Sequence, residues 1–263
     1  MGELLFVGLG LGGVEDMSVR ALNALRGCDV IYGEFYTSRL IDSDLGQLEK
    51  YIGKGIKRLD RVDVEEGEEL IEVAKSRKVA FVTAGDTMAA TTHVDLRLQA
   101  IEQGIPTRLI HGVSVFTACA SALGLQPYKF GRTITLPFQE KGYSPSSPYE
   151  NILENHERGL HSLVLLDIRE AEGRYMSASE GTRWLMDAEE RIRGGLIRDD
   201  TLLVGCARVG SSSERLLAGY PSRLRDQDLG PPLHTLVVPG KLHFMEAEAL
   251  VRLADAPPEI IKE

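Results

Sequence analysis

The stretch Leu4-Leu5-Phe6-Val7-Gly8-Leu9-Gly10-Leu11-Gly12-Gly13 decides the fold. Its apolar half predicts a buried strand, and the glycines that follow at once predict a loop whose backbone approaches another group closely. Gly8, Gly10 and Gly13 also have the G-x-G-x-x-G spacing of a dinucleotide-binding loop. The identity of the ligand of this loop is therefore the first question that the sequence poses.

The residues after the glycines argue against a dinucleotide. A Rossmann loop leads directly into a helix whose N-terminus holds the pyrophosphate. Here the first helical pattern begins only at Ser18, and Glu15 and Asp16 lie before it. Two carboxylates at that position would repel a pyrophosphate. Glu34, at the end of the next predicted strand, is a candidate ribose-binding acid, so an NAD-dependent oxidoreductase stays open as an alternative.

The composition is typical of a globular protein with one large or two modest domains. The 263 residues are 43% hydrophobic and 26% charged, and the net charge of -9 argues against binding to nucleic-acid phosphates. No apolar run approaches the roughly 20 residues that span a bilayer, and no basic segment precedes the first apolar run. We therefore expect neither a membrane segment nor a signal peptide.

The three cysteines, Cys28, Cys119 and Cys206, are far apart and lack the spacing of a metal or redox site. We interpret them as buried thiols in a reducing compartment, and therefore expect a cytoplasmic protein without a metal.

Short apolar runs alternate with helical patterns in the first half, which is typical of an α/β fold with a mostly parallel sheet. Strands are expected at residues 4–9, 30–33, 56–59, 79–83 and 107–110. Helices are expected at residues 18–25, 66–74, 89–103 and 115–123, the first with Ser18 as its N-cap.

The pattern changes near residues 125–132, and a second α/β unit follows. Its strands are expected at residues 133–136, 162–168, 202–207 and 235–238, and its helices at residues 149–157, 179–193 and 246–253. Gly142, two prolines and three serines predict a long loop over residues 139–148. We therefore predict two α/β domains, 1–126 with a mostly parallel sheet and 127–263 with a mixed sheet.

Three stretches of the first domain follow the carboxyl ends of predicted strands, where open α/β sheets bind ligands. They are Gly8 to Gly13, Ala84 to Thr87 and His111 to Ser114. Asp86 is either the N-cap of the helix expected from Ala89 or a carboxylate for ribose hydroxyls or an ammonium group.

Two further polar residues near these strand ends favour structural roles. His93 lies within the expected helix at 89–103, and we interpret it as a partly buried structural residue. Ser114 lacks the G-x-S-x-G setting of a hydrolase nucleophile, because Phe116 occupies the last position, and is a better N-cap or hydrogen-bond donor.

Together these stretches resemble the tetrapyrrole methylase superfamily, whose members carry a Gly-rich first loop, a Gly-Asp-Pro motif and a Gly-x-Ser turn. Four segments are similar to those of its diphthine synthase branch: residues 34–38, 90–93, 155–161 and 238–243. Thr87 and His111 depart from the superfamily, since proline is usual at the first position and common at the second. Leu11 also stands where other members often have proline.

The resemblance implies a two-domain homodimer that binds S-adenosylmethionine in a cleft between the domains. It also implies successive methylation of the amino group on a 3-amino-3-carboxypropyl histidine of translation elongation factor 2, a step of diphthamide synthesis. The cofactor contacts that the resemblance implies are Leu11, Asp86, Ala89, Ser114, Val115, Leu166, Val209 and His234. We add Gly10, because it directly precedes Leu11 in the glycine loop.

The physical interpretation agrees with the resemblance on the cofactor, because S-adenosylmethionine has no phosphate that Glu15 and Asp16 would repel. Methyl transfer from a sulfonium requires mainly alignment of an amine with the methyl group, so we expect no covalent nucleophile and no metal. The sequence identifies no proton acceptor. Two alternatives remain besides the NAD enzyme: a tetrapyrrole C-methyltransferase, and a nucleotide-sensing or partner-binding module without catalysis.

Overall fold

The computed structural model describes residues 2–140 and 142–261, which form two compact units. The first unit runs to Val115 and includes the short segments Glu170–Glu172 and Gly210–Ser212, and the second contains the remainder. The units change over at residues 115 and 116, whereas we place the functional domains at 1–126 and 127–263. That assignment stays a prediction, and each unit is described by itself.

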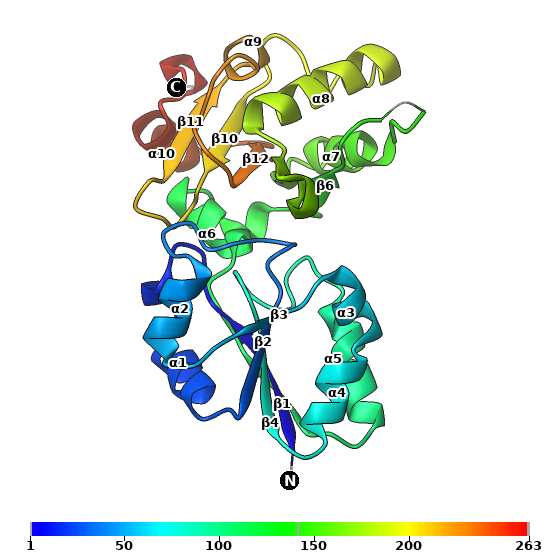
Figure 1. Ribbon diagram of the computed structural model, residues 1–263. Helices are drawn as coiled ribbons and strands as arrows, with labels where there is room; N and C mark the ends of the chain where they lie inside the picture. The colour runs from blue at the N-terminus through cyan, green and yellow to red at the C-terminus, as the bar shows by residue number, and fades with distance from the viewer. Residues whose placement is uncertain (1, 141, 262–263) are drawn as a thin grey trace. The chain divides into compact units, whose positions relative to one another are not determined.

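The first unit is built on a parallel sheet of five strands, as predicted (Figure 1). Its order is β3-β2-β4-β1-β5. The strands are β1 (Glu3–Gly8), β2 (Val30–Gly33), β3 (Lys57–Arg58), β4 (Lys78–Thr83) and β5 (Thr107–Ile110). The central strand β1 therefore has β4 on one side and β5 on the other.

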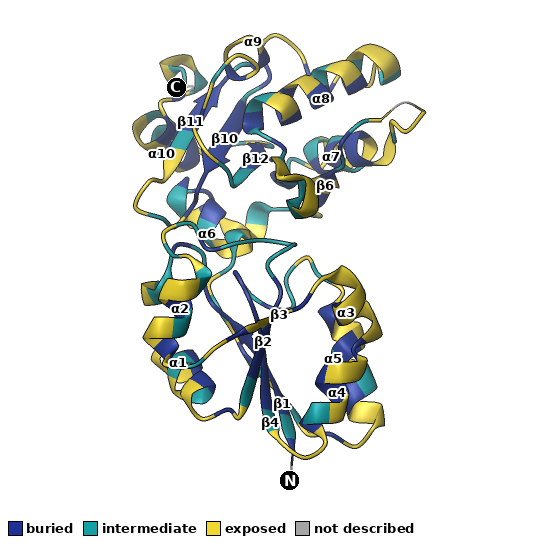
Figure 2. Ribbon diagram, viewed as in Figure 1, coloured by how far each residue is buried: buried dark blue, intermediate teal, exposed yellow. Residues whose placement is uncertain are grey.

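Helices cover both faces of this sheet, as Figure 1 shows. They are α1 (Val19–Arg26) and α2 (Leu45–Ile52) on one face, and α3 (Arg61–Glu66), α4 (Glu68–Ala74) and α5 (His93–Glu102) on the other. Alternate side chains of β1 enter two separate cores: Leu5 and Val7 pack beneath α1 and α2, and Leu4 and Phe6 pack beneath α3 to α5. Burial on both faces explains why β1 is a continuous apolar run (Figure 2).

Two predicted helices of this unit begin later than the sequence pattern indicates. The pattern at 89–103 is helical only from His93, with Thr92 at the N-cap position, so Asp86 does not cap it. Ala90 adopts a left-handed conformation with φ of 58°, which ends any helical course before α5 begins. The helix predicted at 66–74 is α4 and begins at Glu68, because Gly67 at φ 67° separates it from α3, which ends at Glu66.

Ser18 is confirmed as the N-cap of α1, since its hydroxyl accepts a hydrogen bond of 3.0 Å from the Ala21 amide. Before it lies a short 3-10 helix, η1 (Val14–Asp16). The helix α2 has no counterpart in the sequence prediction.

The second unit contains a mixed sheet, as predicted. Its order is β11-β10-β12-β7-β6, in which only β6 and β7 are parallel neighbours. The strands are β6 (Ile134–Leu136), β7 (Ser162–Leu166), β10 (Leu203–Ala207), β11 (Arg215–Gly219) and β12 (His234–Val238). The run at 162–168 is shorter than predicted, because Ile168 belongs to a small ribbon of β8 (Ile168–Arg169) with β9 (Arg174–Tyr175).

The helices of this unit are α6 (Val115–Ala122, whose first residue belongs to the first unit), α7 (Ser147–Glu157), α8 (Ala178–Ile192), α9 (Pro221–Leu224) and α10 (Phe244–Ala254). Short 3-10 helices lie at η2 (Pro127–Lys129), η3 (Glu170–Glu172, in the first unit) and η4 (Pro258–Ile260). Of the predicted loop at 139–148, Lys141 lies outside the described residues, and α7 begins at Ser147. None of the helices in the described ranges is long and apolar enough to cross a bilayer.

The core of the second unit holds Trp184 of α8 among side chains of the sheet. All three cysteines are buried, as predicted. The fold nevertheless brings Cys119 and Cys206 together, with their sulfur atoms 3.6 Å apart, although 87 residues separate them in the chain.

Three glycine backbones meet where β1, β4 and β5 end in the first unit. A Cβ atom on Gly112 would lie 2.2 Å from the carbonyl oxygen of Gly85 and 2.7 Å from the carbonyl carbon of Gly8. A Cβ atom on Gly8 would lie 2.5 Å from that same oxygen. Only glycine permits these approaches, so this glycine junction of Gly8, Gly85 and Gly112 sets the spacing of the three loops.

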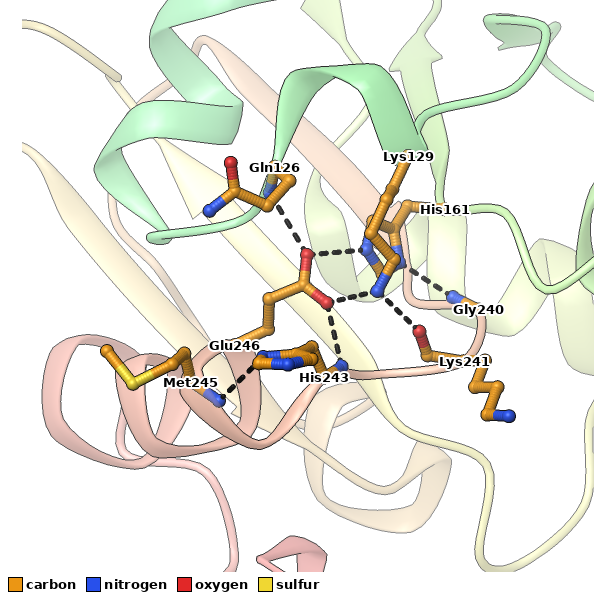
Figure 3. Close-up of polar contacts among 8 residues, drawn as sticks. All are labelled: Gln126, Lys129, His161, Gly240, Lys241, His243, Met245 and Glu246. Atoms are coloured by element: carbon orange, nitrogen blue, oxygen red, sulfur yellow. Dashed lines mark hydrogen bonds and ion pairs between the residues drawn. The ribbon is translucent and has the colours of Figure 1, made fainter.

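A buried carboxylate joins several segments of the second unit (Figure 3). Glu246 of α10 is 1% exposed and accepts hydrogen bonds from the amides of Gln126 (3.1 Å) and His243 (2.8 Å). Lys129 and the Nε2 of His161 also donate to it, the latter at 3.2 Å. Burial alone would raise the pKa of Glu246, but these four hydrogen bonds outweigh it and hold the pKa at about 2.

The glycine junction gives a stability prediction. Replacing Gly112 by alanine should lower the free energy of unfolding by about 3 kcal/mol, because the new methyl group would overlap two backbones. Gly46→Ala is the matched control, since its nearest neighbour would be a side-chain atom 3.4 Å away and alanine favours the helix. Urea unfolding of both variants measures the difference, and a Gly112→Ala protein as stable as the control would contradict the steric argument.

Glu246 gives a second prediction, which concerns pH. Glu246→Gln should cost about 3 kcal/mol near pH 7, because it leaves Lys129 facing a neutral amide. The folded pKa lies below the unfolded value, so this stability is present above pH of about 4.5 and is lost as the pH falls toward 2. Glu248→Gln, which removes an exposed ion pair with Arg252 on the same helix, should change stability little. Equal losses in the two variants, or a pH-independent gap, would refute the assignment.

Candidate functional site

The predicted ligand loops of the first unit lie side by side. Because β4, β1 and β5 are adjacent and parallel, their carboxyl ends share one edge of the sheet. Gly10 and Gly85 form an isolated bridge, with hydrogen bonds of 3.2 and 2.7 Å between their backbones. The half-buried side chain of Leu11 lies over Gly85, 4.0 Å from the position that a Cβ there would take. The structure thus brings Gly10, Leu11 and the Asp86 loop together.

The glycine loop closes onto its own acid. The amide of Gly12 donates a hydrogen bond of 2.5 Å to a carboxylate oxygen of Asp16 in η1. Its carbonyl oxygen accepts from the amides of Ile41 (2.8 Å) and Asp42 (2.7 Å). An amide that a pyrophosphate would require is therefore occupied by a negative charge, which disfavours a dinucleotide.

Glu34, the ribose-binding acid of the NAD alternative, forms hydrogen bonds within its own loop. It is fully buried, and its carboxylate accepts from the amides of Tyr36 and Thr37, both at 3.1 Å, and from the Thr37 hydroxyl at 2.5 Å. The carboxylate stabilises the loop that follows β2. It is not available to a ribose.

Asp86 is a turn residue with an open side. One carboxylate oxygen accepts from the amide of Met88 (3.1 Å), and the other lies 2.8 Å from Nδ1 of His111. Its side chain is 13% exposed, and that of His111 is 73% exposed. Ala89 completes the turn by donating from its amide to the Asp86 carbonyl (3.0 Å). A carboxylate has about four acceptor positions, so Asp86 retains capacity for a ligand.

His93 has the structural role that the sequence predicts. It is 1% exposed, its Nδ1 lies 2.9 Å from the Thr87 carbonyl oxygen, and its ring packs edge-on against Phe81. Burial lowers the pKa of His93 despite the nearby Glu34 carboxylate. Its ring and Thr91 both bind the Thr87 carbonyl, which fixes the turn after Asp86.

Ser114 and Val115 follow the glycine junction directly. Both are half-buried, and Val115 opens α6. They lie two and three residues beyond Gly112, so the glycine junction also constrains the position of their backbone.

In the second unit, Leu166, Val209 and His234 gather at one sheet edge. His234 pairs with Ala207, two residues before Val209, and the neighbouring Thr235 pairs with Leu165. Leu166 and Val209 are buried, at 6% and 8% exposed. Since β12 runs antiparallel to β7 and β10, its start meets their ends.

His234 is held in one tautomer by the backbone. Its Nδ1 accepts from the amide of Ala178 (3.1 Å), so Nε2 carries the proton and donates to the carbonyl of Pro231 (3.1 Å). Burial lowers the pKa of His234, with a smaller lowering from Arg208. The ring is therefore neutral and offers a ligand its apolar surface.

Arg208 is a positioning residue that sequence reasoning passed over. Its guanidinium is buried and donates to Ser213, at 3.0 Å to both the carbonyl and the hydroxyl, and to the carbonyl of Pro231. It thereby joins the segment after β10 to the segment before β12. The local backbone signal of this turn is a left-handed conformation at Arg208 (φ 51°) and again two residues later at Gly210 (φ 81°). Of the two, only the glycine could have been noticed in the sequence.

A cavity of about 470 Å³ in the first unit was also not predicted. Its lining combines aromatic, acidic and basic side chains, including Phe35, Asp42, Arg58 and Glu170. Ser43, also in the lining, accepts a hydrogen bond from the Val14 amide, so the cavity adjoins the glycine loop.

Comparisons with known proteins identify the family of this chain. A family model described as tetrapyrrole (corrin/porphyrin) methylases matches residues 3–220. The diphthine synthase of Methanothermobacter thermautotrophicus is 46% identical over 98% of this chain and 98% of its own. That of Methanocaldococcus jannaschii is 45% identical over 96% of this chain and 99% of its own. A crystal structure of a diphthine synthase has 38% identity and a TM-score of 0.88 over 98% of both chains. The chain therefore belongs to the tetrapyrrole (corrin/porphyrin) methylases and, among them, to the diphthine synthase family.

Proposed function

We propose that this chain is an S-adenosylmethionine-dependent N-methyltransferase of diphthamide biosynthesis. It would methylate, in successive rounds, the amino group of the 3-amino-3-carboxypropyl histidine on translation elongation factor 2. The observation that carries the proposal is the 46% identity over 98% of both chains with a diphthine synthase. Such full-length similarity favours this reaction over a tetrapyrrole C-methyltransferase.

The first unit fits S-adenosylmethionine better than a phosphate-bearing cofactor. The Asp16 carboxylate occupies the Gly12 amide, and Glu34 is sequestered, so both anchors of a dinucleotide are missing from the described loops. Asp86 would hold a ribose hydroxyl or the ammonium group, and Gly10 and Leu11 would supply backbone and apolar contact. Ala89, Ser114 and Val115 complete this proposed set.

Leu166, Val209 and His234 of the second unit are the other proposed cofactor contacts. Two of them are buried apolar side chains and the third presents a neutral ring, which suits an uncharged part of the cofactor such as the adenine. The proposal assigns recognition of charge to the first unit alone.

S-adenosylmethionine supplies a methyl group on a positively charged sulfur that is already a good leaving group. The chain has to orient the acceptor amine and exclude competing nucleophiles, and positioning of this kind contributes on the order of 7 to 11 kcal/mol. We propose no covalent nucleophile and no metal. We also propose a cytoplasmic homodimer, as the family resemblance implies.

A labelled methyl group tests the reaction directly. The purified protein is incubated with methyl-labelled S-adenosylmethionine and elongation factor 2 that bears the unmethylated intermediate. We expect label on the modified histidine, located by peptide mass spectrometry, and none on factor that lacks the 3-amino-3-carboxypropyl group. Unlabelled histidine in the competent factor would overturn the proposal.

Asp86 tests the cofactor site. Asp86→Ala should weaken binding of S-adenosylhomocysteine about 10- to 100-fold in calorimetry, because a charge-assisted hydrogen bond contributes about 1.5 to 3 kcal/mol. Asp95→Ala removes an exposed aspartate of α5 and should leave the affinity unchanged. NAD should raise the melting temperature of neither protein. Unaltered affinity in the Asp86 variant would remove this residue from the site.

A further inference from the structure

We propose that His111 is the group that accepts the proton of the substrate amine, and that Asp86 orients it. This inference rests on the proposed function, which requires an amine as the methyl acceptor. An alkylamine with a pKa of about 10 is almost entirely an ammonium ion at neutral pH, and an ammonium nitrogen has no electron pair to offer. A proton acceptor is therefore needed before methyl transfer, and a base beside the cofactor loops would provide one at neutral pH.

The geometry of the pair fixes the imidazole in a basic tautomer. Nδ1 of His111 lies 2.8 Å from Oδ2 of Asp86, and an ionised carboxylate can only accept a hydrogen bond. Nδ1 must therefore carry the proton, which leaves the lone pair on Nε2. With 73% of the side chain exposed, Nε2 can be reached by a substrate.

The backbone that carries the His111–Asp86 pair is fixed by contacts of its own. His111 lies between the end of β5 at Ile110 and Gly112 of the glycine junction. Asp86 is fixed independently, because its second oxygen accepts from the Met88 amide and its carbonyl accepts from Ala89. Both residues belong to loops that meet at one sheet edge, so the glycine junction sets the distance between them.

Four other titratable groups of the first unit near this edge are engaged in contacts of their own, and Glu15 is an exposed carboxylate, which is a weaker base than an imidazole. Asp16 binds the Gly12 amide, and Glu34 is buried within its own loop. His93 is buried and bound to the Thr87 carbonyl. Asp42 accepts from the amide and hydroxyl of Ser212. His111 is the exposed imidazole among these groups, with 73% of its side chain accessible.

The proton transfer balances as follows. Nε2 of His111 takes a proton from the ammonium nitrogen, the N–H bond breaks, and its electrons remain on the amine while the imidazole becomes positively charged. Those electrons form the new bond to the methyl carbon, and the electrons of the carbon–sulfur bond stay on sulfur. Asp86 stabilises the imidazolium meanwhile. The exposed ring then gives its proton to water, which readies it for the next methyl group.

The test compares His111→Asn with the unaltered protein across pH. With saturating S-adenosylmethionine, kcat of the variant at pH 7 should fall about 100-fold or more, as removal of a general base predicts. Its rate should then rise about tenfold for each pH unit up to about 9, because only free amine formed in solution remains reactive. Binding of S-adenosylhomocysteine should stay within about twofold, which separates a lost base from a damaged cofactor site.

His243→Asn is the matched control, because it replaces another exposed histidine with a residue that can still cap α10. It should retain the parent rate and pH profile. If the unaltered protein methylates but His111→Asn keeps the parent kcat and pH profile, the inference fails while the proposed function survives. If the unaltered protein transfers no methyl group, both fail.

A measurement without turnover examines the pair itself. Nitrogen-15 NMR of the full chain, with His111 assigned through His111→Asn, should show the Nδ1–H tautomer of the neutral ring. Asp86→Asn should abolish that preference. An Nε2–H tautomer in the unaltered protein would overturn the proposed orientation whatever the activity.

Discussion

The close approach of three glycine backbones is the constraint on which the first unit depends. Gly8, Gly85 and Gly112 end or follow three adjacent parallel strands, and a single carbonyl oxygen, that of Gly85, lies within 2.5 Å of the Cβ positions of the other two. No side chain fits there. The loops that carry Leu11, Asp86 and His111 consequently leave the sheet from one small area. Their mutual distances are set by backbone packing, which is stiffer than any arrangement of surface side chains.

In the second unit, buried charged side chains hold the loops together. Glu246 gathers the amides of Gln126 and His243 with Lys129 and His161, while Arg208 joins the segments around Ser213 and Pro231. Each ion is surrounded by enough partners to offset its loss of water. Arg208 fixes the segments that carry Val209 and His234, whereas the Glu246 cluster joins segments beside the start of β7 and after β12. Glycine contact in the first unit and ionic contact in the second thus hold loops in place by different physical means.

The sequence predicted the elements whose signals are local. The short strands β2 and β5 were placed at their observed limits, and Ser18 was recognised as a cap. The start of α5 was missed because Ala89 and Ala90 favour a helix. The turn that they form instead is held by hydrogen bonds from the side chains of Thr91 and His93 to the Thr87 carbonyl. β11 was missed because its residues lie at the sheet edge and alternate too weakly to stand out.

The candidate site was predictable in its list of residues but not in its chemistry. Strand-end logic and the resemblance selected Asp86, yet the hydrogen bond to His111 spans 25 residues and no spacing rule connects them. The same holds for Arg208, whose partners lie 5 and 23 residues away. Side-chain pairs formed across loops depend on backbone paths that apolar periodicity does not describe. The structure is needed for such pairs.

The acids of the first unit explain why a dinucleotide spacing occurs without a dinucleotide site. In a phosphate-binding loop the free amides are the binding groups, so a nearby carboxylate would compete for them. Here Asp16 takes the Gly12 amide, which stabilises the loop and leaves negative charge at the strand ends. A sulfonium cofactor carries positive charge and no phosphate, so the same acids that exclude a pyrophosphate are compatible with it. The glycine spacing reports tight backbone contact, and the residues around it decide which ligand that contact serves.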